Sequence, residues 1–321
     1  MHAGSSLLSA GRWKPWEPAV WLLAFAVPQF LPGHSLLVSE IAIVALFAMS
    51  LDLILGYAGI VSLGHAAFFG VGAYAAALFA KHVMPDPLAG LAAAMLVATA
   101  LGAVCSLTIM RGSDLTRIMV TLGVGLIMME LANKLDWLTG GADGLQGVVM
   151  GPVLGRFDFD LTGRTAAYYS LTMCLVCFLL LRRLVRSPLF ATLMAIRDNS
   201  LRATAIGIPV QSRLALVYTL AACVAGLAGG LLAQTTGFAS LDLFALDRSA
   251  DLMLVLVIGG TGWLWGGIAG AVVFKLMHDV ISSITPQYWT FWIGLFLVVL
   301  VVVGRNKLLR PWTWFGRTKT P

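Results

Sequence analysis

The chain has 321 residues, of which 59% are hydrophobic and only 11% are charged, and its mean hydropathy is +0.90. Soluble domains carry about 25% charged residues, so this composition excludes an ordinary soluble fold and indicates a membrane protein. The formal net charge is +6, but the basic residues lie between apolar segments rather than on one continuous face. This distribution indicates membrane topology and argues against nucleic acid as a partner.

Apolar windows along the chain predict the spanning helices. A bilayer core about 30 Å thick requires about 20 mainly apolar residues for each spanning helix. The charge-poor windows of this kind are 17–32, 36–55, 63–80, 87–110, 115–135, 166–182, 214–237, 250–284 and 288–304. We therefore expect an all-α polytopic membrane protein with about 8–10 transmembrane helices. A single domain covers 1–321, and its membrane-embedded core is 15–304.

Two dense clusters of glycine interrupt these windows, at 56–72 and 259–270, and a shorter run lies at 226–230. Glycine weakens a helix, so its abundance at membrane depth needs a reason. One explanation is close packing of helices, and the GxxxG spacing within 226–230 and 266–270 is typical of it. The other is a broken helix, which is tolerated where the backbone is buried in protein or lines a water-filled path. The density of the two outer clusters favours a break in at least one of them.

The charges of the loops predict which side of the membrane each occupies, because short cytoplasmic loops are enriched in Lys and Arg. The segment 182–213 has six arginines against one acid, and the tail 305–321 has basic residues and no acid. Acids outnumber bases in the loops 136–165 and 238–251. We expect 182–213, the tail and both termini in the cytoplasm, and the two acidic loops on the outer side.

The window 250–284 must be interrupted for this topology to hold. One crossing per window would leave the basic tail on the outer side, against the charge rule. The window therefore either enters and leaves on the outer side as two pieces or crosses twice as short helices. The sequence IGGTGWLWGGIAG, from Ile258 to Gly270, is where we expect the break.

The motifs of several enzyme classes are absent. The chain has no GxxxxGK[ST] phosphate loop, no HExxH and no GxSxG. Cys174 and Cys177 form a CxxC without a second ligand pair, and ionisable residues such as Asp52 lie singly in or beside the windows. We predict no catalytic residues, no metal site and no cofactor. The residues also form no proton relay, and the lone His65 fits a hydrogen-bonded structural residue better than a proton carrier.

The loop 186–213, RSPLFATLMAIRDNSLRATAIGIPVQSR, predicts two short helices. Leu189, Leu193 and Ile196 recur at helical spacing, and a second helical stretch ends at Gly207. A helical hairpin too short to span the membrane is suited to dock into a partner. The alternative is an amphipathic helix that rests on anionic lipid.

Three motifs together carry a resemblance to a known family. They are GYAGIVSLGHAAFFGVGAY, AIRDNSLRATAIGI and VLVIGGTGWLWGGIAGAVV. The chain resembles, from about Ile41 to Gly304 and in the same order, the permease subunits of branched-chain amino acid ABC transporters, in the LivM-like branch of the LivH/LivM family. The resemblance implies an importer of branched-chain (hydrophobic) amino acids in the bacterial inner membrane.

The same resemblance implies the partners of this chain. They are a LivH-like second permease that forms a heterodimer with it, two cytoplasmic ABC ATPase subunits, which hydrolyse ATP in its place, and an extracytoplasmic solute-binding protein. The loop 186–213 would be the coupling helix that seats in the ATPase, although Leu201-Arg202-Ala203 stands where Glu-Ala-Ala is expected. The residues implied in coupling are Arg197, Asp198, Asn199, Arg202, Ala203 and Gly207.

Alternating access driven from outside the chain is the mechanism that the resemblance implies. The broken segments would line the translocation pathway with Ser62, Gly64, His65, Gly259, Gly260, Thr261 and Gly262. The same scaffold could instead carry urea, short amides or another amino acid. Two further alternatives are a secondary carrier that works alone and a membrane scaffold.

Overall fold

A computed structural model describes residues 16–109, 112, 114–160, 162–284 and 286–303 of the chain. The basic N-terminal segment and the tail 305–321, both predicted in the cytoplasm, lie outside the described residues.

Helices make up the regular structure of the described residues, which otherwise contain two isolated β-bridges. The elements in chain order are α2 (Trp16–Phe30), η1 (Pro32–His34), α3 (Ser35–Asp52), η2 (Leu53–Tyr57), α4 (Ala66–His82), α5 (Pro87–Ile109), α6 (Asp114–Lys134), α7 (Asp136–Thr139), η3 (Gly141–Asp143), α8 (Arg164–Val185), α9 (Pro188–Asp198), α10 (Ser200–Ala205), α11 (Val210–Thr236), η4 (Leu241–Phe244), α12 (Leu246–Gly259), α13 (Leu264–Ile284) and α14 (Trp289–Val303). The element η2 is a π-helix that continues α3, whereas η1, η3 and η4 are short 3-10 helices.

Each charge-poor window coincides with one of these helices, or with two in the case of 250–284. Six helices in the described part of the chain are long and apolar enough to cross a membrane: α3 with η2, α5, α6, α8, α11 and α13. The windows 17–32, 63–80 and 288–304 correspond to α2, α4 and α14, which have 15, 17 and 15 residues. The expected class, an all-α polytopic membrane protein, is confirmed.

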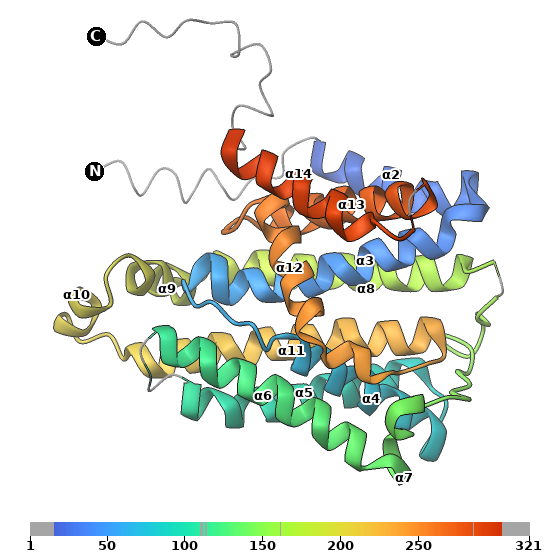
Figure 1. Ribbon diagram of the computed structural model, residues 1–321, viewed down its shortest axis with the longest axis horizontal. Helices are drawn as coiled ribbons and strands as arrows, with labels where there is room; N and C mark the ends of the chain where they lie inside the picture. The colour runs from blue at the N-terminus through green and yellow to red at the C-terminus, as the bar shows by residue number, and fades with distance from the viewer. Residues whose placement is uncertain (1–15, 110–111, 113, 161, 285, 304–321) are drawn as a thin grey trace, which may run out of the picture.

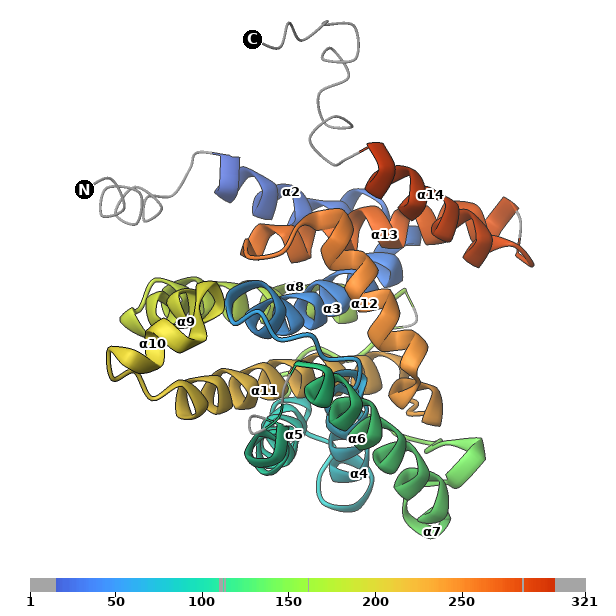
Figure 2. The ribbon, with the colours of Figure 1, turned by 60° about the vertical axis from the view of Figure 1, so that its left-hand side comes forward.

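The long helices form layers (Figure 1). Helices α2, α13 and α14 lie on one side, α3 and α8 come next, and α11 separates them from the group of α4, α5 and α6 (Figure 2). Helices α3 and α11 are the most buried of the six spans. Helix α12 is steeply inclined to the others, while α9 and α10 lie at one end of the bundle and α7 lies at the other (Figure 1).

Glycines allow α11 to lie directly against α4 and α5. A Cβ at Gly229 would overlap the backbone carbonyl of Phe69 in α4, and one at Gly226 would overlap the Ala98 side chain in α5. Gly72 of α4 faces Gly226 in the same manner. The glycine run at 226–230 therefore serves close packing, the first of the two explanations.

Buried polar pairs join α8 to helices far away in the sequence. Arg182, near the end of α8, forms an ion pair with Glu17 of α2, and both side chains are almost fully buried. The hydroxyls of Ser39 in α3 and Ser170 in α8 are 2.9 Å apart. Because a buried charge or hydroxyl is costly without a partner, these pairs fix the position of α8 against α2 and α3.

The two acidic loops meet at the α7 end of the bundle. Leu145 and Ala239 exchange backbone hydrogen bonds of 2.8 and 3.2 Å. Phe244 of η4 fills the space beside Gly70 of α4 and stacks on Tyr74, with ring centroids 5.6 Å apart. The loops that the charge rule assigns to one side thus lie at the same end of the structure, opposite α9 and α10.

Candidate functional site

The first break separates α3 from α4. After the π-helix η2 the chain has no regular structure until α4 begins at Ala66. Gly59 has a φ of +73°, which glycine adopts without the strain that other residues incur. Ile60 N donates to Ile54 O at 2.8 Å and closes the turn. A π-helical turn in a membrane helix is often found at a functional site.

The start of α4 is held by a residue of α12. Ser249 Oγ accepts a hydrogen bond from Ala66 N at 3.0 Å and so satisfies one free amide of the helix N-terminus. His65 is fully buried, and its Nε2 lies 2.8 Å from Ser50 Oγ. Since the single hydrogen of Ser50 is donated to the Phe47 carbonyl at 2.6 Å, the histidine Nε2 must be the donor to Ser50. His65 is therefore a hydrogen-bonded residue of the core.

Ser62 and Gly64 of the same break face neighbouring helices. A Cβ at Gly64 would overlap the Thr121 carbonyl of α6. Ser62 is fully buried and lies beside Tyr218 of α11. The first break is thus enclosed by protein on this side, as non-helical backbone at membrane depth requires.

The second break is the short turn between α12 and α13. Gly260 and Gly262 have φ angles of +97° and +76°, which other residues rarely adopt. A Cβ at Gly266 would overlap the Gly260 carbonyl, so α12 and α13 pack backbone to backbone. Thr261 is exposed in this turn. The predicted interruption of 250–284 is confirmed, and its glycines serve both a break and close packing.

The two breaks lie against each other. Asp52, the last residue of α3, is fully buried, and its Oδ1 accepts a hydrogen bond from Gly262 N at 2.7 Å across 210 positions of sequence. A Cβ at Gly56 would overlap both the Asp52 carboxylate and the Gly262 amide. The absence of a side chain at Gly56 therefore permits the contact between the breaks.

Helix α9 contacts this junction from the predicted coupling loop. Arg197 Nη1 donates to the Gly56 carbonyl, and the Arg197 Cγ would be 2.9 Å from a Cβ at Gly59. The ring of Tyr57 in η2 packs edge-on against Phe190 of α9, with centroids 5.3 Å apart. A residue expected to act in coupling thus touches a segment expected to line the pathway.

The two helices of the coupling loop have different surroundings. Helix α9 buries Phe190, Leu193 and Ile196, so its apolar face lies against the rest of the chain rather than against lipid. Helix α10 projects from the end of the bundle (Figure 1), and Leu201 and Ile206 there are 83% and 72% exposed. Leu201 and Ile206 thus place apolar side chains on the outer surface of this tip.

The remaining predicted coupling residues shape this tip. Asn199 Oδ1 accepts a hydrogen bond from Arg202 N at 2.8 Å and caps α10. Ala203 is buried beneath the tip, and Gly207 turns the chain after α10 with a φ of +86°. Asp198 and Arg202 are exposed.

Sequence reasoning assigned no role to Asp52, Gly56, Leu201 or Ile206. The sequence could have pointed to Asp52. An acidic residue inside an apolar window is energetically costly and usually has a partner or a function, and this one lies shortly before a glycine cluster. Gly56 was seen only as one member of that cluster. Leu201 and Ile206 had no signal, because apolar residues in a short helical stretch are ordinarily buried.

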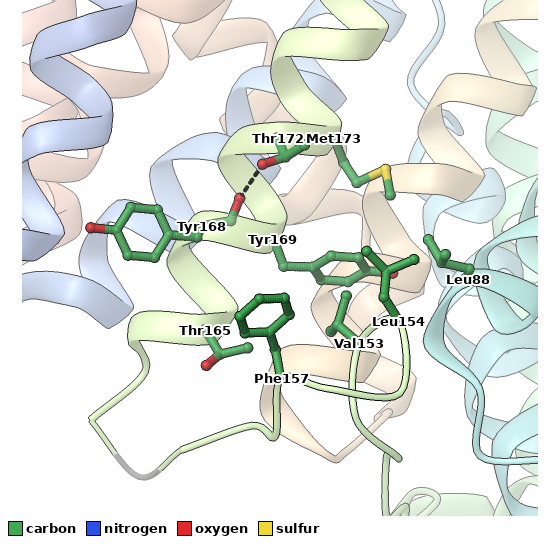
Figure 3. A pocket seen from close by; sticks show the side chains of 9 residues that line it. All are labelled: Leu88, Val153, Leu154, Phe157, Thr165, Tyr168, Tyr169, Thr172 and Met173. Atoms are coloured by element: carbon green, nitrogen blue, oxygen red, sulfur yellow. Dashed lines mark hydrogen bonds between the residues drawn. The ribbon is translucent and has the colours of Figure 1, made fainter.

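A separate cavity of about 520 Å³ lies at the end of α8 farthest from α9 (Figure 3). Its lining is almost entirely apolar: Leu88, Val153, Leu154, Phe157, Thr165, Tyr168, Tyr169, Thr172 and Met173. Tyr169 donates its hydroxyl to Gln234 at 3.0 Å, and Thr172 donates to the Tyr168 carbonyl at 2.7 Å. With these hydroxyls already paired, the cavity offers few polar groups to a zwitterion and does not belong to the site at the breaks.

A known protein family accounts for this architecture. Residues 35–303 match the family described as branched-chain amino acid transport system, permease component. The chain belongs to this family. The match includes both glycine breaks and the loop with α9 and α10, so the geometry above is that of a permease.

Two curated relatives match nearly the whole permease. It is 24% identical to the high-affinity branched-chain amino acid transport system permease protein LivM of Escherichia coli strain K12, over 92% of this chain and 74% of the relative. It is 26% identical to the protein of the same name from Salmonella typhimurium strain LT2, with the same shares covered. A shorter match, 28% identical over 36% of each chain, is to the fructose import permease protein FruG of Bifidobacterium longum. No solved structure matches the permease.

Proposed function

We propose that this permease forms half of the translocation pathway of an ATP-driven ABC importer for branched-chain (hydrophobic) amino acids. The observation that carries the proposal is the contact of Arg197, in the predicted coupling loop, with the junction of the two glycine breaks. An ATPase that displaced α9 would act on the breaks without any intervening element. Family membership and the names of the two long matches favour the substrate class.

The proposed partners supply the functions that this chain lacks. The chain lacks a phosphate-binding loop, so two cytoplasmic ATPase subunits supply the energy, a LivH-like permease supplies the other half of the pathway, and an extracytoplasmic solute-binding protein delivers the substrate. The exposed tip of α10, with Leu201 and Ile206, is the surface on which we place the ATPase contact.

Transport proceeds by alternating access in this proposal. Displacement of α9 moves the first break through the Arg197 and Phe190 contacts, and the motion reaches the second break at the hydrogen bond between Asp52 and Gly262. Packed helices then shift between outward-open and inward-open arrangements. A branched-chain amino acid needs little more than an apolar path with a few backbone groups, so affinity resides in the binding protein.

The orientation belongs to the same proposal. The arginine-rich end with α9 and α10 lies in the cytoplasm, the end with both acidic loops lies outside, and both termini are cytoplasmic in the bacterial inner membrane. Cysteines introduced at Leu201 and Val149, which are 83% and 76% exposed, test this with a membrane-impermeant maleimide. Only Val149→Cys should react in intact cells, and both should react in opened membranes. Labelling of Leu201→Cys in intact cells would contradict the coupling assignment.

Reconstituted transport tests the function and its alternatives. We expect uptake of labelled leucine, isoleucine or valine into proteoliposomes only when both permeases, the ATPases, the binding protein and hydrolysable ATP are present. A non-hydrolysable ATP analogue is the matched control. Urea, a short amide and fructose are tested in the same assay. Preferential uptake of one of them would show that the substrate is not a branched-chain amino acid. Ion-driven uptake by the single chain would show a secondary carrier instead.

A further inference from the structure

The Asp52 carboxylate is buried and only half satisfied. Its Oδ1 accepts the hydrogen bond from Gly262 N at 2.7 Å, and the Trp263 backbone amide also lies near the carboxylate. Its Oδ2 is buried and makes no hydrogen bond. A buried carboxylate oxygen without a donor is unfavourable, so this arrangement gains stability from any donor that can approach.

Arg197 is the cation placed to approach it. It reaches Gly56, the residue that lies directly against the Asp52 carboxylate. Its guanidinium carries five N–H donors, and the structure records one side-chain hydrogen bond for it, from Nη1 to the Gly56 carbonyl. A Cβ at Gly262 would lie 3.7 Å from the same Nη1.

Glycines border the Arg197 side chain. Gly56, Gly59 and Gly262 present no side chains to it, and the Arg197 residue is exposed overall. A small displacement of α9 would exchange the Gly56 carbonyl for the free oxygen of Asp52. Ion pairs and packed interfaces that have two discrete arrangements are the elements that amplify such small displacements.

We propose that Asp52 is a positioning residue and forms, with Arg197, a two-state latch between the coupling helix and the second break. In one state Asp52 holds the Gly262 amide and Arg197 holds the Gly56 carbonyl. In the other state Arg197 pairs with Asp52, the hold on Gly262 weakens, and the turn that carries Thr261 is released. The latch rests on the proposed function, because it is the step by which ATPase motion would reach the pathway.

Transport by the full assembly tests the charge pair. Asp52→Asn keeps an acceptor for Gly262 and the side-chain volume but removes the charge. We expect at least a tenfold loss of ATP-dependent uptake while ATP hydrolysis and the thermal unfolding midpoint are kept. Arg197→Gln should give the same loss, the double variant should be no worse than either single one, and Arg197→Lys should recover most of the uptake.

Two matched variants control for charge removal elsewhere. They are Asp279→Asn, at an exposed position of α13, and Arg183→Gln, at an exposed position near the end of α8. Both should transport as the unmodified chain does. Wild-type uptake by Asp52→Asn, or losses from Asp52→Asn and Arg197→Gln that multiply in the double variant, would overturn the latch.

A second measurement does not depend on ATP-driven transport. Cysteine placed at the exposed Thr261 is labelled with a maleimide in membranes that contain the full chain, and the chain without it gives the background from the buried or half-buried native cysteines. Asp52→Ala should raise the labelling rate at least threefold because it frees the turn. Asp52→Asn and Arg197→Gln should lower it because the turn can no longer be released.

The two measurements separate the latch from the proposed function. If the unmodified assembly shows no ATP-driven uptake but the labelling changes as expected, the importer function is contradicted and the hydrogen bond of Asp52 to the turn is supported. Equal labelling rates in all three variants would remove the latch even where transport is confirmed.

Discussion

Gly64 of the first break lies so close to the backbone carbonyl of Thr121 on α6 that no side chain would fit between them. This contact holds α6, the least buried of the six helices that are long and apolar enough to cross a membrane, against the first break. It also predicts how the protein responds to added volume at this point.

Gly64→Val should destabilise the fold by more than about 1–3 kcal/mol, the usual effect of overpacking, because the neighbouring Thr121 carbonyl is rigid backbone. The thermal unfolding midpoint of the purified protein in detergent measures the effect. Gly123→Ala, also in α6 but with open space around it, is the control and should be neutral or stabilising by up to about 1 kcal/mol. Equal effects of the two substitutions would contradict the contact.

The exposed tip of α10 predicts substitutions that weaken binding of the ATPase subunits without destabilising the fold. Leu201→Asp and Ile206→Asp remove exposed apolar surface, so they should leave the unfolding midpoint unchanged and reduce co-purification of the ATPase subunits at least tenfold. Val149→Asp places the same charge on an exposed apolar residue at the opposite end of the bundle. Co-purification that falls equally in all three variants would show a general defect rather than a docking surface.

Gly207 predicts a local effect on the same tip. Its φ of +86° and the open space around it mean that a side chain would meet strain but no clash. Gly207→Val should therefore cost about 1–2 kcal/mol in the turn, keep the membrane helices folded and uncouple ATP hydrolysis from uptake. Unchanged uptake would count against the coupling assignment. Enlarging the buried Ala203 should disturb the packing of the tip as well.

The ion pair of Glu17 and Arg182 predicts strong coupling between two substitutions. Each single change, Glu17→Leu or Arg182→Met, leaves a buried charged partner and should cost about 3–5 kcal/mol of unfolding free energy. The double variant Glu17→Leu with Arg182→Met should recover much of that loss, because no charge is left buried. A double-mutant cycle on unfolding in detergent measures the coupling, and additive losses would show that the pair is not the cause.

The contacts of Gln234 near the start of α8 predict losses of unfolding free energy of two different sizes. It accepts the Tyr169 hydroxyl at 3.0 Å and donates to the Pro87 carbonyl at 2.7 Å, so it joins α8, α11 and the start of α5. Tyr169→Phe should cost about 1 kcal/mol, and Gln234→Ala should cost more because it leaves both partners unpaired. Thermal unfolding again provides the readout. A larger loss from Tyr169→Phe than from Gln234→Ala would place the stabilising contact elsewhere.

Sequence alone determined the class of this protein and the positions of its elements. Each apolar window coincides with a helix, and the interruption of 250–284 falls at the glycine cluster, because the bilayer imposes local rules of length, hydropathy and charge on every crossing. The loop 186–213 was also predictable as two short helices, since its apolar spacing and terminal glycine are local signals.

The contacts between these elements became known only from the tertiary structure. That Asp52 holds Gly262, that Arg197 contacts Gly56, and that His65 is a core residue bonded to Ser50 depend on residues brought together by packing. It also divided the glycines into those that break a helix and those that only permit close approach. A pattern along the chain shows which residues are small or charged, whereas their neighbours are chosen by the packing of the whole bundle.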